Sequence, residues 1–289
     1  MTFERRVERQ IADLRERRWP DLERAVTARR LAWADAHRQR LAGASAPTPR
    51  QAFDLLFFDY MGLDARDLPV VAESADEIVW ESRNPCPTVE ACRALGLDTR
   101  RVCRAVYEKS TQALISRLDP ALRFLRDYAR IRPHADHCRE RVVRVDFETL
   151  MGMALEEAHT SRREGNKGYG AVIALGREVV AKAHDTAATE GDPSLHAEVN
   201  AIRASVRRLG ETDLSGCILV STCEPCPMCA SLAVWANLSA IVFGASIEET
   251  MALGRTRIDL GCEEIIAKSP VIMEVIGGVR AEECLALYA

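Results

Sequence analysis

The sequence has no apolar run long enough to span a lipid bilayer. Its first residues, Met1-Thr-Phe-Glu-Arg-Arg6, lead into a heavily charged segment and contain no apolar signal core. The sequence also has no internal repeat and no low-complexity tract. We therefore expect a protein without a membrane span or a secretory leader, built from ordinary globular domains.

Basic residues are scarce in the second half of the chain. Residues 1–150 contain 27 lysines and arginines against 24 acidic residues, whereas the remainder contains 12 against 19. The segment from Gly277 to Tyr288 has almost none. Because tight RNA binding relies on several phosphate contacts from Lys and Arg, this deficit argues against a nucleic-acid partner for the second half. A small molecule is the substrate that we expect there.

Cysteine, by contrast, is abundant, with ten residues in a chain of 289. Without a secretion signal, this number predicts a reducing, cytoplasmic location, in which thiols bind metals or pack in cores. The length is sufficient for two domains. The hydrophobic fraction of 47% and the charged fraction of 28% are typical of a globular protein.

The most informative motif is His196-Ala-Glu198, followed about thirty residues later by Pro225-Cys226-Pro-Met-Cys229. One imidazole and two thiolates are three ligands for Zn²⁺, and they leave the fourth tetrahedral position open for water, as in catalytic zinc sites. Zinc lowers the pKa of such a water to about 7, which makes a nucleophile. Glu198 is not needed as a ligand and is therefore free to move protons.

The Cys-x-x-C pair taken alone is a weak signal, because structural zinc sites and redox pairs share it. The alternative to a catalytic site is a structural zinc ion with Cys223 as the fourth ligand. In that alternative Glu198 would have no purpose.

The residues around the motif predict where its ligands lie. Ser194 is a candidate N-cap for a helix, and apolar residues recur at helical spacing over 197–209. The run 217–222 is typical of a buried strand, and 229–236 of a second helix. The metal would then lie at two helix N-termini, whose positive ends favour thiolates.

The rest of this half predicts an α/β fold. A helix is expected over 147–159, a hairpin around Gly176, and further strands at 241–243 and 271–276. Strands alternating with helices indicate an α/β/α sandwich with a mixed sheet. The boundary between domains is expected near 141–146, which gives domains 1–145 and 146–289.

The first domain is expected to be a mostly helical α+β unit. Residues 4–42 predict two helices, or one kinked at Pro20, followed by a loop over 43–49. Thr48 begins a capping box for a helix that reaches Tyr60. The remaining expected elements are a hairpin of Val70-Val71 with Ile78–Trp80, a short helix after Cys86, and another from Asp98 to Tyr107.

This domain has a second group of candidate ligands, namely Cys86, Cys92, Cys103, His134, His137 and Cys138. The four thiols could hold an iron–sulfur cluster or zinc, although their spacing suits none of the usual ligand sets. The alternative is that they are small core residues.

From about Asp146 to its C-terminus the chain resembles the cytidine deaminase superfamily, in the branch of guanine deaminases, fungal cytosine deaminase and bacterial tRNA adenosine deaminases. The matching stretches are Gly170-Ala-Val-Ile173, His196-Ala-Glu-Val-Asn-Ala-Ile-Arg203, Cys223-Glu-Pro-Cys-Pro-Met-Cys229 and Ala240-Ile-Val-Phe-Gly-Ala245. The resemblance implies that His196, Cys226 and Cys229 hold zinc and that Glu198 shuttles protons. It also implies that the N–H of Ala197 binds a ring carbonyl and that the carbonyl of Pro225 receives the leaving amine.

Two positions depart from the family pattern. Gly168-Tyr169 stands where Pro-Phe is usual, and Asp185 stands where an Asn usually binds the base. An amide donates and accepts, whereas an ionised carboxylate only accepts. Asp185 therefore predicts a substrate that presents a ring N–H or an exocyclic amine. The alternative is that Asp185 caps a turn.

These observations predict a zinc-dependent aminohydrolase acting on a free nucleobase or a related amino-substituted heterocycle. Two alternatives stay open. One is tRNA adenosine deamination, with the Arg-rich residues 1–150 gripping the RNA. The other is a zinc-stabilised interaction protein without turnover. The resemblance also implies a homodimer, with Trp235 at the interface.

Overall fold

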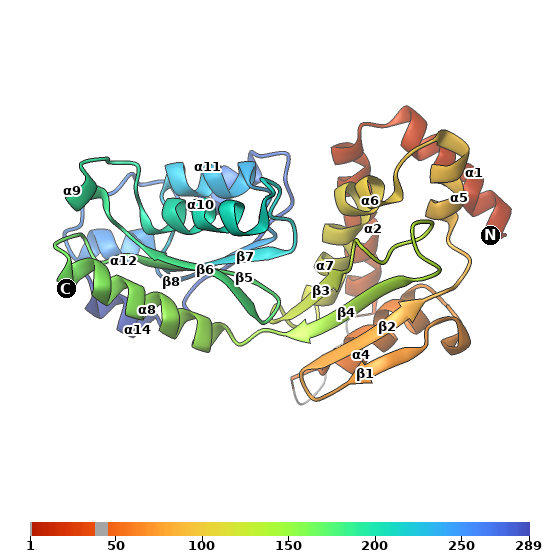
Figure 1. Ribbon diagram of the computed structural model, residues 1–289, viewed down its shortest axis with the longest axis horizontal. Coiled ribbons are helices and arrows are strands. Elements are labelled where there is room, and N and C mark those ends of the chain that lie inside the picture. Colours follow the sequence, from red (N-terminus) through yellow and green to blue (C-terminus); the bar gives the residue numbers. More distant parts are fainter. Residues whose placement is uncertain (1, 38–45) are drawn as a thin grey trace. The chain divides into compact units, whose positions relative to one another are not determined.

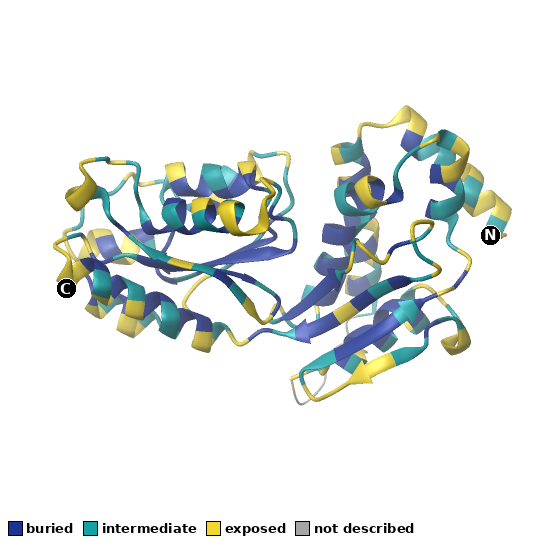
Figure 2. Cartoon of the chain, viewed as in Figure 1, coloured by how far each residue is buried: buried dark blue, intermediate teal, exposed yellow. Residues whose placement is uncertain are grey.

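The computed structural model describes residues 2–37 and 46–289, and the chain forms two compact units, Met1–Val145 and Asp146–Ala289 (Figure 1). Each unit has its own buried interior, which Figure 2 shows in dark blue along the strands and the inner helix faces. Among the described residues, none of the helices has both the length and the apolar character that a membrane crossing requires.

The sheet of the first unit is antiparallel throughout. Within the described residues its order is β1-β2-β4-β3, with β1 at Val70–Glu73, β2 at Glu77–Ser82, β3 at Leu122–Arg126 and β4 at Cys138–Arg144. The predicted hairpin is confirmed as β1 and β2. Strands β3 and β4 were not predicted, because charged residues interrupt their apolar pattern. Arg123 and Glu140 are nevertheless buried in them.

The helices of the first unit confirm the prediction of two N-terminal helices rather than one kinked helix. Pro20 lies in the first turn of the second helix, where its missing N–H costs nothing. The capping box at Thr48 is also present. Of the predicted loop, residues 46–48 form no regular element and 43–45 lie outside the described residues. The α-helices are α1 (Phe3–Glu16), α2 (Trp19–Ala36), α4 (Pro49–Asp54), α5 (Pro87–Leu95), α6 (Thr99–Val102) and α7 (Lys109–Ser116).

Two of these helices continue as π-helices. Leu55–Tyr60 follows α4, and Cys103–Glu108 follows α6. The predicted helices to Tyr60 and to Tyr107 are therefore confirmed in extent, with a wider helical winding in their second halves.

The second unit contains a mixed sheet, as predicted. Its order is β6-β5-β7-β8-β9, in which β5 pairs antiparallel with β6 and β7, and β8 pairs parallel with β7 and β9. The strands are β5 (Gly170–Leu175), β6 (Glu178–His184), β7 (Cys217–Cys223), β8 (Ala240–Ala245) and β9 (Glu274–Ile276).

Helices cover both faces of this sheet (Figure 1). α10 (Ala197–Leu209) and α11 (Pro227–Trp235) lie on one face, and α8 (Phe147–Arg163) and α14 (Ala281–Ala286) lie on the other. Short helices α9 (Ala187–Glu190), α12 (Ile247–Ala252) and α13 (Cys262–Ala267) complete the unit. The predicted α/β/α sandwich is confirmed.

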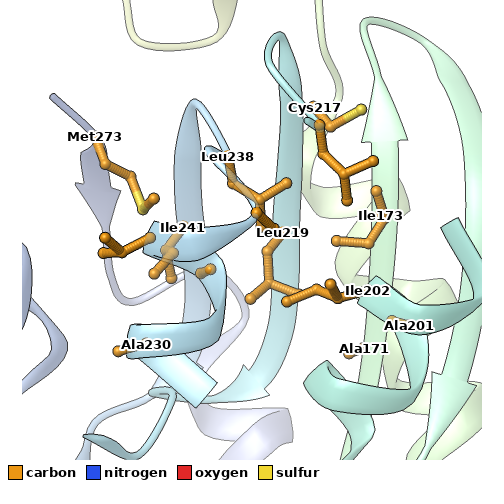
Figure 3. Packing of buried hydrophobic residues seen from close by; sticks show 14 of the residues in the cluster. Ala171, Ile173, Ala201, Ile202, Cys217, Leu219, Ala230, Leu238, Ile241 and Met273 are labelled. Carbon is orange, nitrogen blue, oxygen red and sulfur yellow. The ribbon is translucent and has the colours of Figure 1, made fainter. Parts of the chain in front are cut away.

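The core beneath α10 and α11 follows from strand alternation. Every residue of β7 is buried, which is expected for a central strand covered on both faces. Alternate residues of β5 and β7, such as Ile173 and Leu219, point toward Ala201 and Ile202 of α10 and Ala230 of α11 (Figure 3). This packing fixes the N-termini of both helices against the same edge of the sheet.

Gly170 begins β5 at a point where α8 passes very close. A Cβ atom at this position would lie 2.0 Å from the carbonyl oxygen of Ala154. Only glycine allows this approach, which explains why the stretch Gly170-Ala-Val-Ile173 begins with a glycine.

One strand was predicted too long. The run 271–276 is apolar, but the strand is only Glu274–Ile276. It begins where pairing with β8 begins, at Ala240 opposite Glu274. Before that point the chain turns at Ser269, whose hydroxyl accepts from the N–H of Val271.

Candidate active site

Two helix starts bring the predicted ligands together. His196 is the N-cap of α10 and Cys226 is the N-cap of α11, both with extended backbone, so the ligands lie at two helix N-termini as predicted. The N-cap of α10 is His196 rather than the predicted Ser194, and α11 begins at Pro227 rather than at Cys229. Cys229 lies in the first turn of α11 and is fully buried. The positive ends of both helices therefore point at one place, which stabilises thiolate there.

The three ligand atoms are spaced as tetrahedral zinc requires. Nδ1 of His196 lies 3.7 Å from Sγ of Cys226 and 3.5 Å from Sγ of Cys229, and the two sulfurs are 3.7 Å apart. Zinc bonds of about 2.3 Å to sulfur and about 2.0 Å to nitrogen place tetrahedral ligand atoms about 3.5–3.8 Å apart. The donor set and its geometry thus suit a zinc ion.

Charge at this site also favours metal binding. The Cys229 thiol, which donates to Cys226, and the neighbouring His196 imidazole lower the pKa of the Cys226 thiol to about 4. The hydrogen bond to Cys226 and the carboxylate of Glu198 raise the pKa of His196. A sulfur that is already a thiolate near neutral pH needs no further proton release before it binds a cation.

The group consists of three ligands among the described residues, and no other set of His, Cys, Asp and Glu side chains there converges in the same way. Cys223, the fourth ligand of the structural-zinc alternative, does not belong to the group, and its Sγ accepts from the guanidinium of Arg257 instead. Within the part of the chain that the structure describes, the second set of candidate ligands does not form such a group either: Cys86, Cys92, Cys103, His134, His137 and Cys138. The site near His196 therefore keeps an open position, as a catalytic zinc site does.

Glu198 stands beside the ligands but apart from them. Its side chain is 6% exposed, Ser221 donates to one carboxylate oxygen over 3.2 Å, and the other oxygen lies 3.5 Å from Sγ of Cys229. Burial raises the pKa of the Glu198 carboxyl. A raised pKa makes this carboxyl a better proton acceptor than an exposed one, which suits a proton shuttle.

The two backbone groups implied by the resemblance, the N–H of Ala197 and the carbonyl of Pro225, lie at the starts of α10 and α11. Ala197 is the first residue of α10 and is fully buried, and N–H groups in a first turn have no partner within their helix. Pro225 is buried directly before the N-cap of α11. Both groups are therefore placed at the same helix ends as the metal ligands.

Asp185 is the most unusual residue of the site. It is fully buried at the end of β6, and neither of its carboxylate oxygens has a hydrogen-bond partner among the described residues. After Cys226 and Glu198, the Asp185 carboxylate also contributes to the raised pKa of His196. A turn cap would accept backbone N–H bonds. The Asp185 side chain makes none, so the turn-cap alternative is not supported.

Three further residues near the site, Ser221, Arg257 and Tyr288, were not identified from the sequence, whereas Tyr169 was noted there only as a departure from the family pattern. Ser221 contacts Glu198, the rings of Tyr169 and Tyr288 lie 5.0 Å apart, and the guanidinium of Arg257 lies over Tyr169 at 4.8 Å. Nε of Arg257 is buried without a partner among the described residues. Arg257 and Tyr288 come from segments with no motif, so nothing in the sequence separates them from other arginines and tyrosines.

The sandwich and its His-Cys-Cys-Glu group are those of a zinc-binding hydrolase. Comparison with known sequences identifies the family to which the chain belongs. The family profile "Cytidine and deoxycytidylate deaminase zinc-binding region" matches residues 145–245. The tRNA-specific adenosine deaminase of Bacillus subtilis (strain 168) is 36% identical over 137 residues, which cover 47% of this chain and 83% of that protein.

Three further comparisons give similar sequence identities. The guanine deaminase of Bacillus subtilis (strain 168) is 35% identical, covering 38% of this chain and 71% of that protein. The solved structure of a Bacillus subtilis guanine deaminase aligns with a TM-score of 0.36 at 34% identity, covering 38% of this chain and 70% of that one. The tRNA(Ile)-lysidine synthase of Deinococcus deserti is 36% identical over a stretch that covers 47% of this chain. That stretch is only 25% of the length of the synthase.

The chain therefore belongs to the cytidine deaminase family of zinc-dependent hydrolytic deaminases. The resemblance stated from the sequence is confirmed, including its branch, because guanine deaminase and tRNA adenosine deaminase are both among the relatives.

Proposed function

We propose that this protein is a zinc-dependent hydrolytic deaminase of a free nucleobase or a related amino-substituted heterocycle. The observation that carries the proposal is the buried Glu198 carboxyl beside three convergent candidate zinc ligands. In this proposal residues 146–289 are the deaminase domain, with His196, Cys226 and Cys229 as ligands. Residues 1–145 are a separate domain.

The proposed reaction assigns one task to each group. Bound zinc supplies Lewis-acid activation of a water molecule at neutral pH. Glu198 would take one proton from the attacking water and deliver it to a ring nitrogen, and would then take the second proton, that of the new hydroxyl group, and deliver it to the departing amine, so that a ring carbonyl and ammonia result. Ser221 fixes one oxygen of Glu198, which leaves the other to move the proton. The N–H of Ala197 would hold a ring carbonyl, and the carbonyl of Pro225 would accept from the amine.

The substrate class follows from Asp185. A buried carboxylate without a partner is costly, and a ligand N–H is the group that satisfies it. We therefore propose a ring that presents an N–H or exocyclic amine toward Asp185. A ring with only acceptors at that point would face two unpaired carboxylate oxygens.

tRNA adenosine deamination is the second candidate, and the similarity to a tRNA-specific adenosine deaminase favours it. The acidic character of residues 151–289 weighs against it, since that region has 12 basic against 19 acidic residues. The zinc-stabilised interaction protein is the third candidate, and the retained Glu198 weighs against it.

A screen for ammonia release separates the three candidates. The zinc-loaded protein is incubated with purines, pyrimidines, triazines and pterins, and separately with tRNA. Ammonia from small rings supports the proposal. Ammonia from tRNA alone would support tRNA adenosine deamination. No release from either would support the zinc-stabilised interaction protein.

Asp185→Asn should change substrate preference. Loss of the charged acceptor should reduce kcat/KM for the native substrate about ten- to hundredfold, since a hydrogen bond to a charged group contributes about 1.5–3 kcal/mol. The variant should gain activity on guanine or cytosine relative to wild type. Kinetics on both substrates measure this, with the exposed Asp259→Asn as a control. An unchanged ratio of kcat/KM values would refute the role of Asp185.

We also propose a homodimer, and light scattering should give twice the chain mass at micromolar concentration. Trp235 at the end of α11 is 80% exposed, and Met228 on the same helix is 39% exposed. Exposed aromatic and Met side chains are typical of interfaces. Trp235→Glu should shift the protein toward the monomer. A wild-type monomer at that concentration would contradict the proposal.

A further inference from the structure

The first unit contains a cavity that is independent of the zinc site. Its volume is about 500 Å³, within the range of small-molecule sites. Tyr60, Tyr107 and Phe124 contribute aromatic lining, and Arg30 and Arg126 contribute two guanidinium groups. The lining residues all lie between Arg6 and Glu140, within the first unit.

Arg30 of α2 is a buried cation without a countercharge. It is 7% exposed, and its Nη1 donates to the carbonyl of Tyr107 and the hydroxyls of Ser110 and Thr111. Its guanidinium lies 5.8 Å from the ring centre of Tyr60. Nε has no partner, and Arg30 forms no ion pair with any residue that the structure describes. Only neutral groups accept from this buried cation, so an anion in the cavity would compensate its charge.

Arg126 of β3 carries a second orphan donor into the same cavity. Its Nε and Nη2 both donate to one oxygen of Glu140, at 2.8 and 2.6 Å, and its guanidinium lies 5.2 Å from the ring centre of Phe124. Nη1 is buried without a partner among the described residues. Burial lowers the pKa of Arg30, and the charge of Arg126 lowers it further.

The cavity lining is strongly cationic. Six arginines line it, whereas only two acidic residues do. The arginines are Arg6, Arg9, Arg29, Arg30, Arg126 and Arg132. The two acids, Asp13 and Glu140, already form ion pairs with arginines. An excess of guanidinium groups attracts anions, and their planar, forked donors suit carboxylate and phosphate groups.

We propose that this cavity binds a small organic anion, whose phosphate or carboxylate group pairs with the guanidinium groups of Arg30 and Arg126 and whose unsaturated ring packs against Tyr60 and Phe124. The aromatic residues provide the surface for the ring, and the two guanidinium groups provide the anchor for the charge. The proposal does not depend on the deaminase reaction, because the cavity shares no residue with the zinc ligands.

Calorimetric titration of the 289-residue chain tests the site with defined probes. AMP represents a ring with a phosphate and orotate a ring with a carboxylate, whereas adenosine and uracil are neutral counterparts and inorganic phosphate lacks the ring. We expect AMP or orotate to bind at submillimolar concentration, at least about tenfold more tightly than its neutral counterpart. Which of the two binds decides between phosphate and carboxylate.

Arg30→Gln should weaken the bound anion about ten- to hundredfold, whereas Arg24→Gln should not change it. Arg24 lies on the same helix, is exposed and pairs with Asp21 at the surface. A second pair of variants guards against misfolding of Arg30→Gln. Met61 lines the cavity and is 39% exposed, so Met61→Glu and Met61→Gln should both fold. Only the negatively charged variant should weaken the anion.

Hydrogen exchange locates the bound probe. Protection on anion binding is expected in segments 56–63, 80–89 and 103–111, which contribute to the cavity. Three results would overturn the proposal: no binding of AMP, orotate or phosphate up to millimolar concentration, equal affinity in Met61→Glu and Met61→Gln, or protection confined to residues 196–229. The cavity would then hold water only.

Discussion

Glu198→Gln should retain its zinc and lose at least about a thousandfold in kcat, since general acid–base catalysis contributes about 10² to 10⁴ in rate. The amide has nearly the same shape as the carboxyl and can still accept from Ser221, so the site should stay folded. It cannot take up and return a proton, however. The loss should therefore appear in kcat rather than in zinc content.

The measurement is steady-state turnover combined with elemental analysis of the same sample. Glu248→Gln is a matched control, because Glu248 is an exposed carboxylate in the first turn of α12. It should leave both quantities unchanged. Turnover within about tenfold of wild type in a zinc-loaded Glu198→Gln protein would show that another group moves the proton.

Cys226→Ala should lose the metal and the activity together. The wild-type protein should contain about one zinc ion per chain, and removal of one of three protein ligands from a four-coordinate site should abolish stable binding. Because the metal binds the folded state, its loss should also lower the free energy of unfolding. Elemental analysis and thermal unfolding measure the two effects.

Cys223→Ala is the control that separates the catalytic site from a structural one. Cys223 lies next to the site on β7 but contacts Arg257 rather than the ligand group. This variant should retain about one zinc ion per chain. Full zinc in Cys226→Ala, or loss of zinc in Cys223→Ala, would contradict the assignment of His196, Cys226 and Cys229.

The ligand group was predictable from the sequence because its residues lie in two short motifs. A histidine at one helix start and a Cys-x-x-C pair at another need only the two helices to meet, and the intervening strand β7 brings them together. The departure at Asp185 was equally visible, since its position follows a strand that the hairpin around Gly176 already identified.

The remainder of the site depends on tertiary contacts that no local pattern encodes. Arg257 and Tyr288 reach the site from two segments after β8, and their importance follows from the groups they meet, Cys223 and Tyr169. The same holds for the first unit. Strands β3 and β4 carry buried charges such as Glu140, which the pairing with Arg126 compensates only in the folded chain.

The most direct test of the account is the origin of the oxygen in the product. Wild-type protein is incubated, in water enriched in ¹⁸O, with a substrate found in the ammonia screen, and the product is analysed by mass spectrometry. Hydrolytic deamination predicts one ammonia released and one solvent oxygen gained per product molecule, with neither detectable in Glu198→Gln. Ammonia release without incorporation of ¹⁸O, or equal incorporation in Glu198→Gln, would contradict a hydrolytic reaction at this site.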